Sequence, residues 1–342
     1  MPIEVCMAEK PIIIGTRGSA LALAQSNMVA AQCRAAFPKL TFELKIIKTT
    51  GDKLQTASMA QGDLPKGLFT KELEVALVKG RVDLCVHSLK DLPTELPPGL
   101  RLGAVGKRVD VRDVLVYRDA EYLKQAEADK TSAEWTPGQA ERRGFKAHLQ
   151  ARDFPKGAVV ATSSTRRKAQ LLALRPDLKV IEIRGNVATR LQKLFERSEM
   201  DATILAFAGL TRLNFTIKPD GHLVGDAVPD GLFASLMDVD SMLPCVGQAA
   251  IGIEIRANDE RIETICQRLN HYNTFQCVTA ERAFLAGMGG GCQAPVAAYA
   301  EPVGEQMHMR AVSFMNGYKR TEAKRSLKEA AELGTDIASQ LK

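Results

Sequence analysis

The feature that most constrains the fold is a repeated alternation of short apolar runs with longer segments of helical spacing. The first run, PIIIGT at residues 11–16, predicts a buried strand, and a helical stretch follows from Ser19 to Phe37. A second strand is predicted at 41–49, and the strand VDLCVH at 82–87 follows a helix that ends at Gly80. This order of elements predicts a βαβ domain.

The same alternation returns further along the chain. Strands are predicted at 158–164, 179–185 and 201–207, each followed by a helical segment: TRRKAQLLAL, NVATRLQKLFER and AGLTRL. A third segment begins near His271, with a helix containing TAERAFLAG, a glycine run, the strands VAAYA and MHMRAVSF, and a last helix toward Lys342. The chain is therefore predicted to be an α/β protein with two βαβ domains and a small α+β C-terminal domain.

Three stretches interrupt this pattern. Residues 118–157, which hold the single tryptophan Trp135, and residues 214–244 are interpreted as surface insertions with a local helix at most. Residues 50–67 lack apolar periodicity and contain three glycines and a proline, so they predict a long loop that is either functional or mobile.

The seven cysteines are widely scattered and include no CxxC pair. Such a set favours free thiols in a reducing compartment over a disulfide framework or a zinc site, so no metal is predicted. Cys33, Cys85, Cys266 and Cys277 lie in apolar periodic segments and are predicted to be small core residues. The sequence has neither a signal-like start nor a run of about 18 apolar residues, so a soluble cytoplasmic protein without a membrane partner is expected.

The placement of the arginines is more informative than the net charge of +6. Six arginines follow predicted strands or lie in or just beyond the following helices: Arg17, Arg166, Arg167, Arg184, Arg190 and Arg212. Ligands of open α/β sheets bind outside the carboxyl ends of strands, where helix N-termini also attract anions. Hydroxyl donors lie in the same zone: Ser19, Thr162, Ser163 and Ser164. We therefore expect a ligand with several carboxylates or phosphates, which the guanidinium fork binds bidentately.

Nucleic acid is the rival polyanion, and the sequence argues against it. No continuous basic run is present, and an aromatic content of 5% leaves little for base stacking. The expected ligand is therefore a small polyanion rather than DNA or RNA.

The stretch HSLKDLP at 87–93 directly follows the predicted strand VDLCV. Asp91 is expected at the carboxyl end of that strand, facing the same cleft as the arginines. It could be a structural partner of an arginine, or it could donate a proton to a leaving group and then hold a cationic intermediate. Lys90 as a Schiff-base lysine and His87 with Cys292 as a thiol-protease pair are further alternatives, and spacing decides neither.

A glycine-rich run, GMGGGCQAP at 287–295, ends in Cys292. Gly289, Gly290 and Gly291 can adopt backbone angles that other residues avoid. The run could be an adaptable loop with a chance cysteine, or it could keep a thiol accessible so that a bulky group can be attached there.

Taken together, several stretches resemble the porphobilinogen deaminase family, also called the hydroxymethylbilane synthases. The matching stretches run in order from residue 15 to residue 295: GTRGSALALAQ, KGLFTKELEVAL, DLCVHSLKDLP, ATSSTRRKAQL, IRGNVATRLQKL, ILAFAGLTRL, VGQAAIGIE and VTAERAFLAGMGGGCQAP. The resemblance implies an enzyme that joins four porphobilinogen molecules head to tail, with loss of ammonia from each. The implied product is the linear tetrapyrrole hydroxymethylbilane, on the path to haem.

The resemblance also implies a covalent dipyrromethane cofactor, attached by a thioether to Cys292. By motif match, Asp91 is the catalytic aspartate, which would assist loss of ammonia and stabilise the resulting azafulvene cation. Each pyrrole carries an acetate and a propionate, so cationic and polar residues are implied as partners for cofactor and chain carboxylates: Arg17, Ser19, Lys90, Thr162, Ser164, Arg166, Arg167, Arg184, Arg190, Arg212 and Gln248.

The loop at 50–67, with Asp52 and Lys66, resembles the flexible cover of the family's cleft, and Phe69 starts the helix behind it. The sequence departs from the family pattern at Gly62, where many relatives have a lysine, and in VGQAA, where VGQGA is more usual.

The implied fold has three domains: residues 10–106 with 249–267, residues 111–243, and residues 271–342, which carry the cofactor loop. A monomer is expected. The two α/β domains resemble two-lobed periplasmic binding proteins, so the competing hypothesis is a cytosolic polycarboxylate-binding protein without catalysis.

Overall fold

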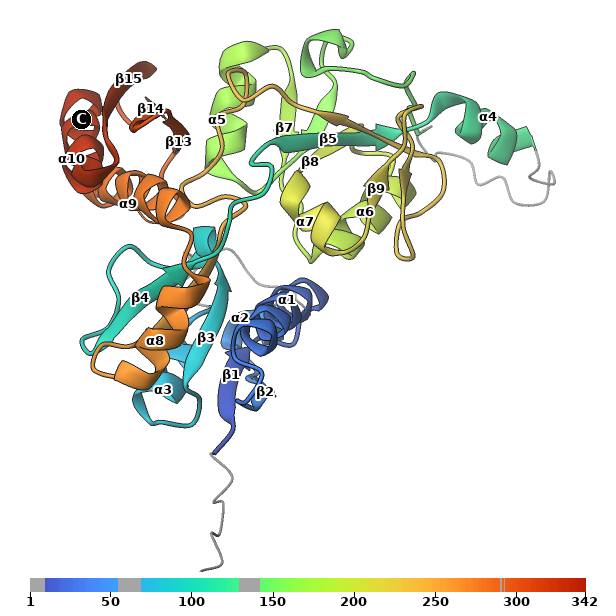
Figure 1. Ribbon diagram of the computed structural model, residues 1–342. Helices are drawn as coiled ribbons and strands as arrows, with labels where there is room; N and C mark the ends of the chain where they lie inside the picture. Colours follow the sequence, from blue (N-terminus) through green and yellow to red (C-terminus); the bar gives the residue numbers. More distant parts are fainter. Residues whose placement is uncertain (1–9, 55–68, 129–141, 290, 292) are drawn as a thin grey trace, which may run out of the picture. The chain divides into compact units, whose positions relative to one another are not determined.

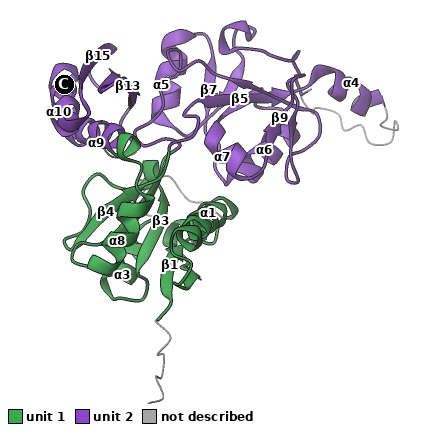
Figure 2. Cartoon of the chain, in the orientation of Figure 1, with its two compact units in different colours: residues 1–107, 250–275 green, residues 108–249, 276–342 purple. Residues whose placement is uncertain are grey.

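The computed structural model describes residues 10–54, 69–128, 142–289, 291 and 293–342 (Figure 1). The chain divides into two compact units (Figure 2). Unit 1 comprises residues 1–107 and 250–275, and unit 2 comprises residues 108–249 and 276–342. The predicted second domain and all but residues 271–275 of the predicted third domain lie in unit 2, so the division into three domains stays a prediction.

Unit 1 is built on a mixed five-stranded sheet with the order β2-β1-β3-β12-β4. Its strands are β1 (Ile12–Thr16), β2 (Phe42–Ile46), β3 (Leu84–Ser88), β4 (Leu100–Val105) and β12 (Ile251–Arg256). β1 pairs in parallel with β2 and β3, whereas β12 runs antiparallel to β3 and β4. The parallel pairs follow from the predicted βαβ order, because a parallel partner needs a crossover connection.

The helices of unit 1 are α1 (Ala20–Ala36), α2 (Thr50–Leu54), α3 (Lys71–Val78) and α8 (Glu260–Leu269). Ser19 begins α1 as its N-cap, because its hydroxyl accepts a hydrogen bond from the backbone N–H of Ala22 at 3.3 Å. Val29, Ala30 and Cys33 of α1 pack in one apolar cluster with Ile12 of β1. The helix α2 corrects the prediction that residues 50–54 belong to a loop, and residues 55–68 lie outside the described part of the chain.

Unit 2 contains a second five-stranded sheet, with the order β11-β5-β8-β6-β7. Its strands are β5 (Asp113–Arg118), β6 (Val159–Ala161), β7 (Lys179–Ile181), β8 (Ala202–Ala206) and β11 (Leu232–Leu236). The helices around it are α4 (Ala120–Ala128), α5 (Thr165–Leu174), α6 (Val187–Glu196) and α7 (Phe207–Arg212). The predicted strand and helix order of this region is confirmed.

The interpretation of 214–244 as a surface insertion with a local helix at most is wrong. In 118–157 the described residues do form local helices, α4 and the 3-10 helix η3 (Ala151–Asp153), but Ala151 and Phe154 are buried in the core rather than on the surface. Residues 214–244 form the hairpin of β9 (Thr216–Ile217) and β10 (Leu223–Val224), and then the buried strand β11, which pairs with β5. In the first stretch, Phe145 and Phe154 pack edge to face with ring centroids 5.1 Å apart. Phe145 and Phe154 are too widely spaced in the sequence to form a periodic pattern.

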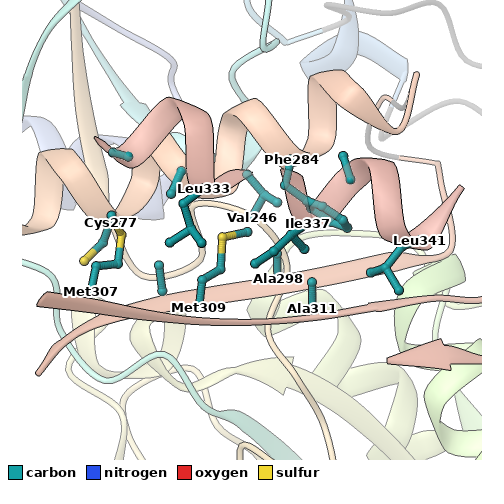
Figure 3. Packing of buried hydrophobic residues seen from close by; sticks show 14 of the residues in the cluster. Val246, Cys277, Phe284, Ala298, Met307, Met309, Ala311, Leu333, Ile337 and Leu341 are labelled. Carbon is teal, nitrogen blue, oxygen red and sulfur yellow. The ribbon is translucent and has the colours of Figure 1, made fainter. Parts of the chain in front are cut away.

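The C-terminal part of the chain forms a three-stranded antiparallel sheet with two helices (Figure 1). The strands are β13 (Val296–Val303), β14 (Gln306–Ser313) and β15 (Lys319–Ser326), and the helices are α9 (Tyr272–Gly287) and α10 (Ala330–Leu341). Figure 3 shows Phe284 of α9 and Leu333 and Ile337 of α10 in one cluster with Met309 of β14. The sequence did not predict β15, because its residues KRTEAKRS are mostly charged. The three sheets confirm the predicted fold class.

The four cysteines predicted to be core residues are all buried. Burial disfavours the thiolate and raises the pKa of Cys33 to about 11 and the pKa values of Cys266 and Cys277 to about 12. These thiols are therefore poor nucleophiles, as expected for packing residues. In the described part of the chain, no helix is both long and apolar enough to span a lipid bilayer.

The backbone of Ala249, in the unusual motif VGQAA, is strained. Ala249, which stands where the family motif more usually has glycine, has a φ of 67°. The left-handed region costs a residue with a Cβ about 1–2 kcal/mol, whereas glycine adopts it freely. Ala249 is also buried, against Val111 and Ala208, so its methyl group contributes packing that offsets part of this strain.

We expect Ala249→Gly and Ala250→Gly to differ in their effects on stability. Both changes remove a buried methyl group and give the unfolded chain more freedom, but Ala249→Gly alone relieves a left-handed residue. Ala249→Gly should leave the free energy of unfolding within about 0.5 kcal/mol of wild type, whereas Ala250→Gly should lower it by about 1–2 kcal/mol. Urea titration measures both. Equal losses would contradict the strain at Ala249.

Candidate active site

Unit 1 contains a pocket at the carboxyl ends of the parallel strands β1 and β3. These strands are neighbours in the sheet, so the residues that follow them lie close together. The residues around the pocket include Arg17, Ser19, Gln25, Phe69, Thr70, His87, Ser88 and Asp91. The structure thus brings together four residues that the sequence predicted for the site: Arg17, Ser19, Phe69 and Asp91.

Asp91 reaches this pocket because its neighbours are anchored in the core. It ends the short 3-10 helix η1 (Leu89–Asp91), which directly follows β3. Leu89 and Leu92 are 1% and 4% exposed, and the backbone N–H of Leu89 donates to the carbonyl of Ala250 at 3.0 Å. Leu89 and Leu92 are therefore fixed in the core, while Lys90 between them is half-buried and Asp91 is exposed.

Arg17 is the cation of this pocket, and it already has a protein partner. Its Nη2 lies 2.5 Å from Oδ1 of Asp52, and its guanidinium carbon lies 4.3 Å from the centre of the Phe69 ring. Thr49 donates its hydroxyl to Asp52 at 2.7 Å. Burial opposes ionisation of Asp52, but the hydrogen bonds from Arg17 and Thr49 outweigh it and lower the pKa of this carboxyl. Lys66, the other loop residue predicted for the site, lies outside the described residues.

Three polar residues of the pocket were missed by the sequence analysis: Gln25, Thr70 and Ser88. The buried amide of Gln25 exchanges hydrogen bonds with the hydroxyl of Ser88, at 2.9 and 3.0 Å. The only signal in the sequence is that Gln25 interrupts the apolar run ALALA of α1. A polar residue on the buried face of a helix needs a partner, and here the partner is on the neighbouring strand.

Unit 2 holds the predicted arginine pair at the start of α5. Ser164 is the N-cap of this helix, and Arg166 and Arg167 are only 4% and 6% exposed. Both guanidinium groups bind the buried carboxylate of Asp113, at 2.8 and 2.7 Å. Gln248 donates to the same carboxylate at 2.9 Å, so three predicted site residues meet at a carboxylate that the sequence analysis did not single out.

This cluster keeps Asp113 ionised in spite of its burial. Desolvation alone would raise the pKa of a fully buried carboxyl, but the charges of Arg166 and Arg167 and their hydrogen bonds hold the pKa of Asp113 well below its usual range. Each arginine also donates to a backbone carbonyl, Arg166 to Leu243 at 2.7 Å and Arg167 to Ile204 at 2.8 Å.

The other predicted residues of unit 2 occupy different environments. Thr162 is buried and accepts a hydrogen bond from the backbone N–H of Ser164 at 3.2 Å. Arg184 lies on the surface, 3.2 Å from Glu182, and Nε of Arg190 donates to the carbonyl of Gly185 at 2.8 Å. The structure therefore does not bring Arg184 into the cluster around Asp113.

Arg212 is a half-buried cation whose guanidinium group donates to a backbone carbonyl. Its Nη2 donates to the carbonyl of Ala249 at 2.7 Å. Burial disfavours the charged form and lowers the pKa of Arg212 to about 10. A guanidinium in such a place is well suited to an anionic ligand, because the ligand would supply the missing negative charge.

Cys292 lies outside the described residues, but the residue after it is held beside the arginine pair. The hydroxyl of Thr165, the first residue of α5, donates to the backbone carbonyl of Gln293 at 2.8 Å. The chain next to the predicted attachment site therefore meets the start of the helix that carries Arg166 and Arg167.

Comparison with known proteins decides the family. Residues 12–264 match the model of the porphobilinogen deaminase dipyrromethane cofactor binding domain, and residues 275–342 match the model of the porphobilinogen deaminase C-terminal domain. The chain belongs to the porphobilinogen deaminase family. The resemblance inferred from the sequence motifs is thereby confirmed.

Individual relatives match over almost the whole chain. Porphobilinogen deaminase of Chlorobium phaeobacteroides is 40% identical over 97% of this chain and 95% of the relative. Those of Syntrophomonas wolfei and Thermus thermophilus are each 40% identical over 96% of this chain and 94% of the relative. Among solved structures, the BenM effector binding domain with benzoate covers 77% of this chain and 91% of its own, at 15% identity and a TM-score of 0.40.

The two porphobilinogen deaminase models divide the predicted site between them. The predicted site residues from Arg17 to Gln248 all fall within the cofactor binding domain model, whereas Cys292 falls within the C-terminal domain model. The roles of the individual residues stay predictions.

We expect Asp113→Asn to destabilise the protein strongly. The change keeps the shape of the side chain but leaves two buried guanidinium groups without a counter-charge, so the free energy of unfolding should fall by about 3–5 kcal/mol at pH 7. Because the native pKa of Asp113 lies below its unfolded value, its contribution is present above about pH 4 and is lost as the pH falls further.

Guanidinium chloride titrations of wild type and variant at pH 7 and pH 3 measure this effect. The stability difference between the two proteins should shrink at pH 3. Asp110→Asn is the matched control, because Asp110 pairs with Arg112 at a half-exposed position and should contribute about 1 kcal/mol or less. Equal losses in the two variants would contradict the role of Asp113.

Proposed function

We propose that this chain is a hydroxymethylbilane synthase. It joins four porphobilinogen molecules head to tail, releases ammonia from each and forms the linear tetrapyrrole hydroxymethylbilane, a precursor in haem biosynthesis. The observation that carries this proposal is the match of both porphobilinogen deaminase models, over residues 12–264 and 275–342. The family match favours this transferase over the polycarboxylate-binding protein considered as the alternative.

Asp91 is proposed as the acid–base residue. Its exposed carboxylate lies in the pocket with Arg17, and its position at the end of η1 is set by the buried leucines on either side. A carboxylate there can hydrogen-bond the pyrrole N–H, stabilise the cation left when ammonia departs, and accept the proton released when the new bond forms. Proton transfer by a positioned group contributes roughly 10²–10⁴-fold to rate.

The described residues of unit 2 fit the dipyrromethane cofactor. Nε of Arg166, Arg167 and Arg212 is buried without a hydrogen-bond partner among the described atoms, so donors are left over for acetate and propionate groups. The cofactor, when bound, supplies the starting pyrroles that are extended. Cys292 is proposed as the anchor, with Arg166, Arg167 and Arg212 among the residues that hold its carboxylates.

The remaining predicted residues keep the roles that the resemblance implies. Ser19, Thr162, Ser164 and Gln248 are proposed as polar partners, and Lys90, Arg184 and Arg190 as cations for the growing chain. Asp52, Lys66 and Phe69 are proposed to belong to the cover of the cleft. We further propose that the protein is a cytoplasmic monomer. We also propose that it does not bind nucleic acid, which the mild net charge of +6 supports.

The cofactor proposal predicts a specific mass. Purified wild-type protein should carry the added mass of a dipyrrole, react with Ehrlich's reagent and release ammonia from porphobilinogen. Cys292→Ser should fold, lack the added mass and lose almost all activity, because the thioether cannot form. Cys33→Ala, which alters a buried thiol of α1, should keep the added mass. Active wild-type protein with the bare sequence mass would overturn the cofactor proposal.

The acid–base proposal predicts that Asp91 is needed for ammonia release but not for attachment of the dipyrrole. Asp91→Asn should keep the attached dipyrrole, because Cys292 is unchanged, but should lower the rate of ammonia release by about 10²-fold or more. Glu95→Gln is the matched control, since Glu95 is an exposed carboxylate of the same segment. A near-normal rate for Asp91→Asn would reassign Asp91 to a structural role.

A further inference from the structure

A buried histidine–glutamate pair lies directly behind the pocket that contains Asp91. Nε2 of His87 on β3 is 3.0 Å from Oε2 of Glu254 on β12, and the two side chains are 4% and 0% exposed. The antiparallel register of the two strands sets this contact, because His87 stands opposite Gly252 and Glu254 lies two residues further along β12. His87 also lines the pocket, so the pair joins the core of the sheet to the site.

The pair has a second feature that simple packing does not require. Oε1 of Glu254 is buried and has no hydrogen-bond partner among the described residues. A buried carboxylate with a free oxygen is costly unless a positive charge can form beside it. The imidazole of His87 is the group that can supply that charge, by taking up a proton.

Of the carboxylates near His87, only Glu254 is recorded in direct contact with the ring, among the described residues. Glu74 of α3 is also buried and interacts electrostatically with both members of the pair, but burial raises the pKa of Glu74 and so favours its neutral form. The charged groups of the pocket itself are Arg17 and Asp91. Glu254 is therefore the carboxylate that directly orients the histidine ring.

Orientation by Glu254 determines which nitrogen of the neutral ring can accept a proton. A carboxylate bound at Nε2 keeps the hydrogen on Nε2, so Nδ1 is left with its lone pair. A buried carboxylate that fixes the tautomer of a pocket histidine and stabilises its protonated form is the arrangement of an acid–base dyad.

We propose that His87, oriented by Glu254, is the proton acceptor that restores Asp91 after each addition. This inference rests on the proposed function. Each addition breaks a C–N bond with loss of ammonia, forms a C–C bond and releases one ring proton, whose electron pair returns to the pyrrole. Asp91 takes up that proton, Nδ1 of His87 accepts it from Asp91, the imidazolium is stabilised by Glu254, and the proton then passes to solvent.

His87→Gln tests the acceptor. The amide can still donate to Glu254, so the buried hydrogen bond is kept while the ring nitrogen is removed. We expect the attached dipyrrole to remain on the protein, as intact mass would report, and ammonia release to fall by about 10²-fold. The acid limb of the pH–rate profile should disappear, an effect that loss of packing alone would not produce.

Glu254→Gln tests the orienting charge. It keeps a hydrogen-bond acceptor for Nε2 but removes the negative charge that favours the protonated ring, so the acid limb should move to lower pH. His308→Asn is the matched control, because His308 forms a similar pair with Glu322, 3.2 Å apart, on the C-terminal sheet. That variant should keep the wild-type rate and pH profile. Unchanged pH profiles in both His87→Gln and Glu254→Gln would overturn the proposal.

A measurement on the wild-type protein keeps the proposal testable even if these variants fail to fold. Nitrogen-15 NMR of the labelled protein should show His87 with its hydrogen on Nε2 and an unprotonated Nδ1 at high pH. A hydrogen on Nδ1 would overturn the proposal. Failure of wild-type protein to release ammonia would instead contradict the proposed function, and it would not alter the tautomer.

Discussion

The constraint on which the unit 2 site depends is that a buried carboxylate must be paired. Asp113 begins β5 with no exposed surface, and it binds Arg166 and Arg167 at the start of α5. The guanidinium groups in turn donate to carbonyls of neighbouring segments, so the charged cluster ties β5, α5 and Gln248 together. The cluster fixes the relative positions of these segments but adds little to the free energy of unfolding, because desolvation offsets much of its Coulomb attraction.

The pocket of unit 1 depends instead on anchored backbone. β1 and β3 are neighbours in the sheet, and each leads to a residue of the pocket: Arg17 comes directly after β1, and Asp91 ends η1, the 3-10 helix after β3. Leu89 and Leu92 are buried in the core, and Asp91 between them lines the pocket. Here the apolar core positions a polar group without contacting it, and rigid elements of this kind suit a site that must hold its geometry through repeated additions.

The arginines of this protein differ in the groups that they contact, and these contacts could not be inferred from the sequence. Arg17 pairs with Asp52 and Arg212 donates to the carbonyl of Ala249, whereas Arg184 forms an exposed ion pair with Glu182. Arg166 and Arg167 are bound to Asp113, and their Nε atoms have no hydrogen-bond partner among the residues that the structure describes. An arginine that is half engaged with the protein is already oriented, so binding a ligand costs less conformational entropy.

The sequence by itself determined the fold class, the order of the periodic elements, the buried cysteines and the resemblance to the family, because these depend on local periodicity and on motifs. It missed β11, although LFASL is a short apolar run between Gly231 and Asp238, and it missed Phe145 and Phe154, which belong to no periodic pattern. It also named Arg17 without its partner Asp52. Only the tertiary structure decided that His87 meets Glu254 and that Asp113 gathers two arginines, because those contacts join residues far apart in the chain, and strand register and burial alone bring them together.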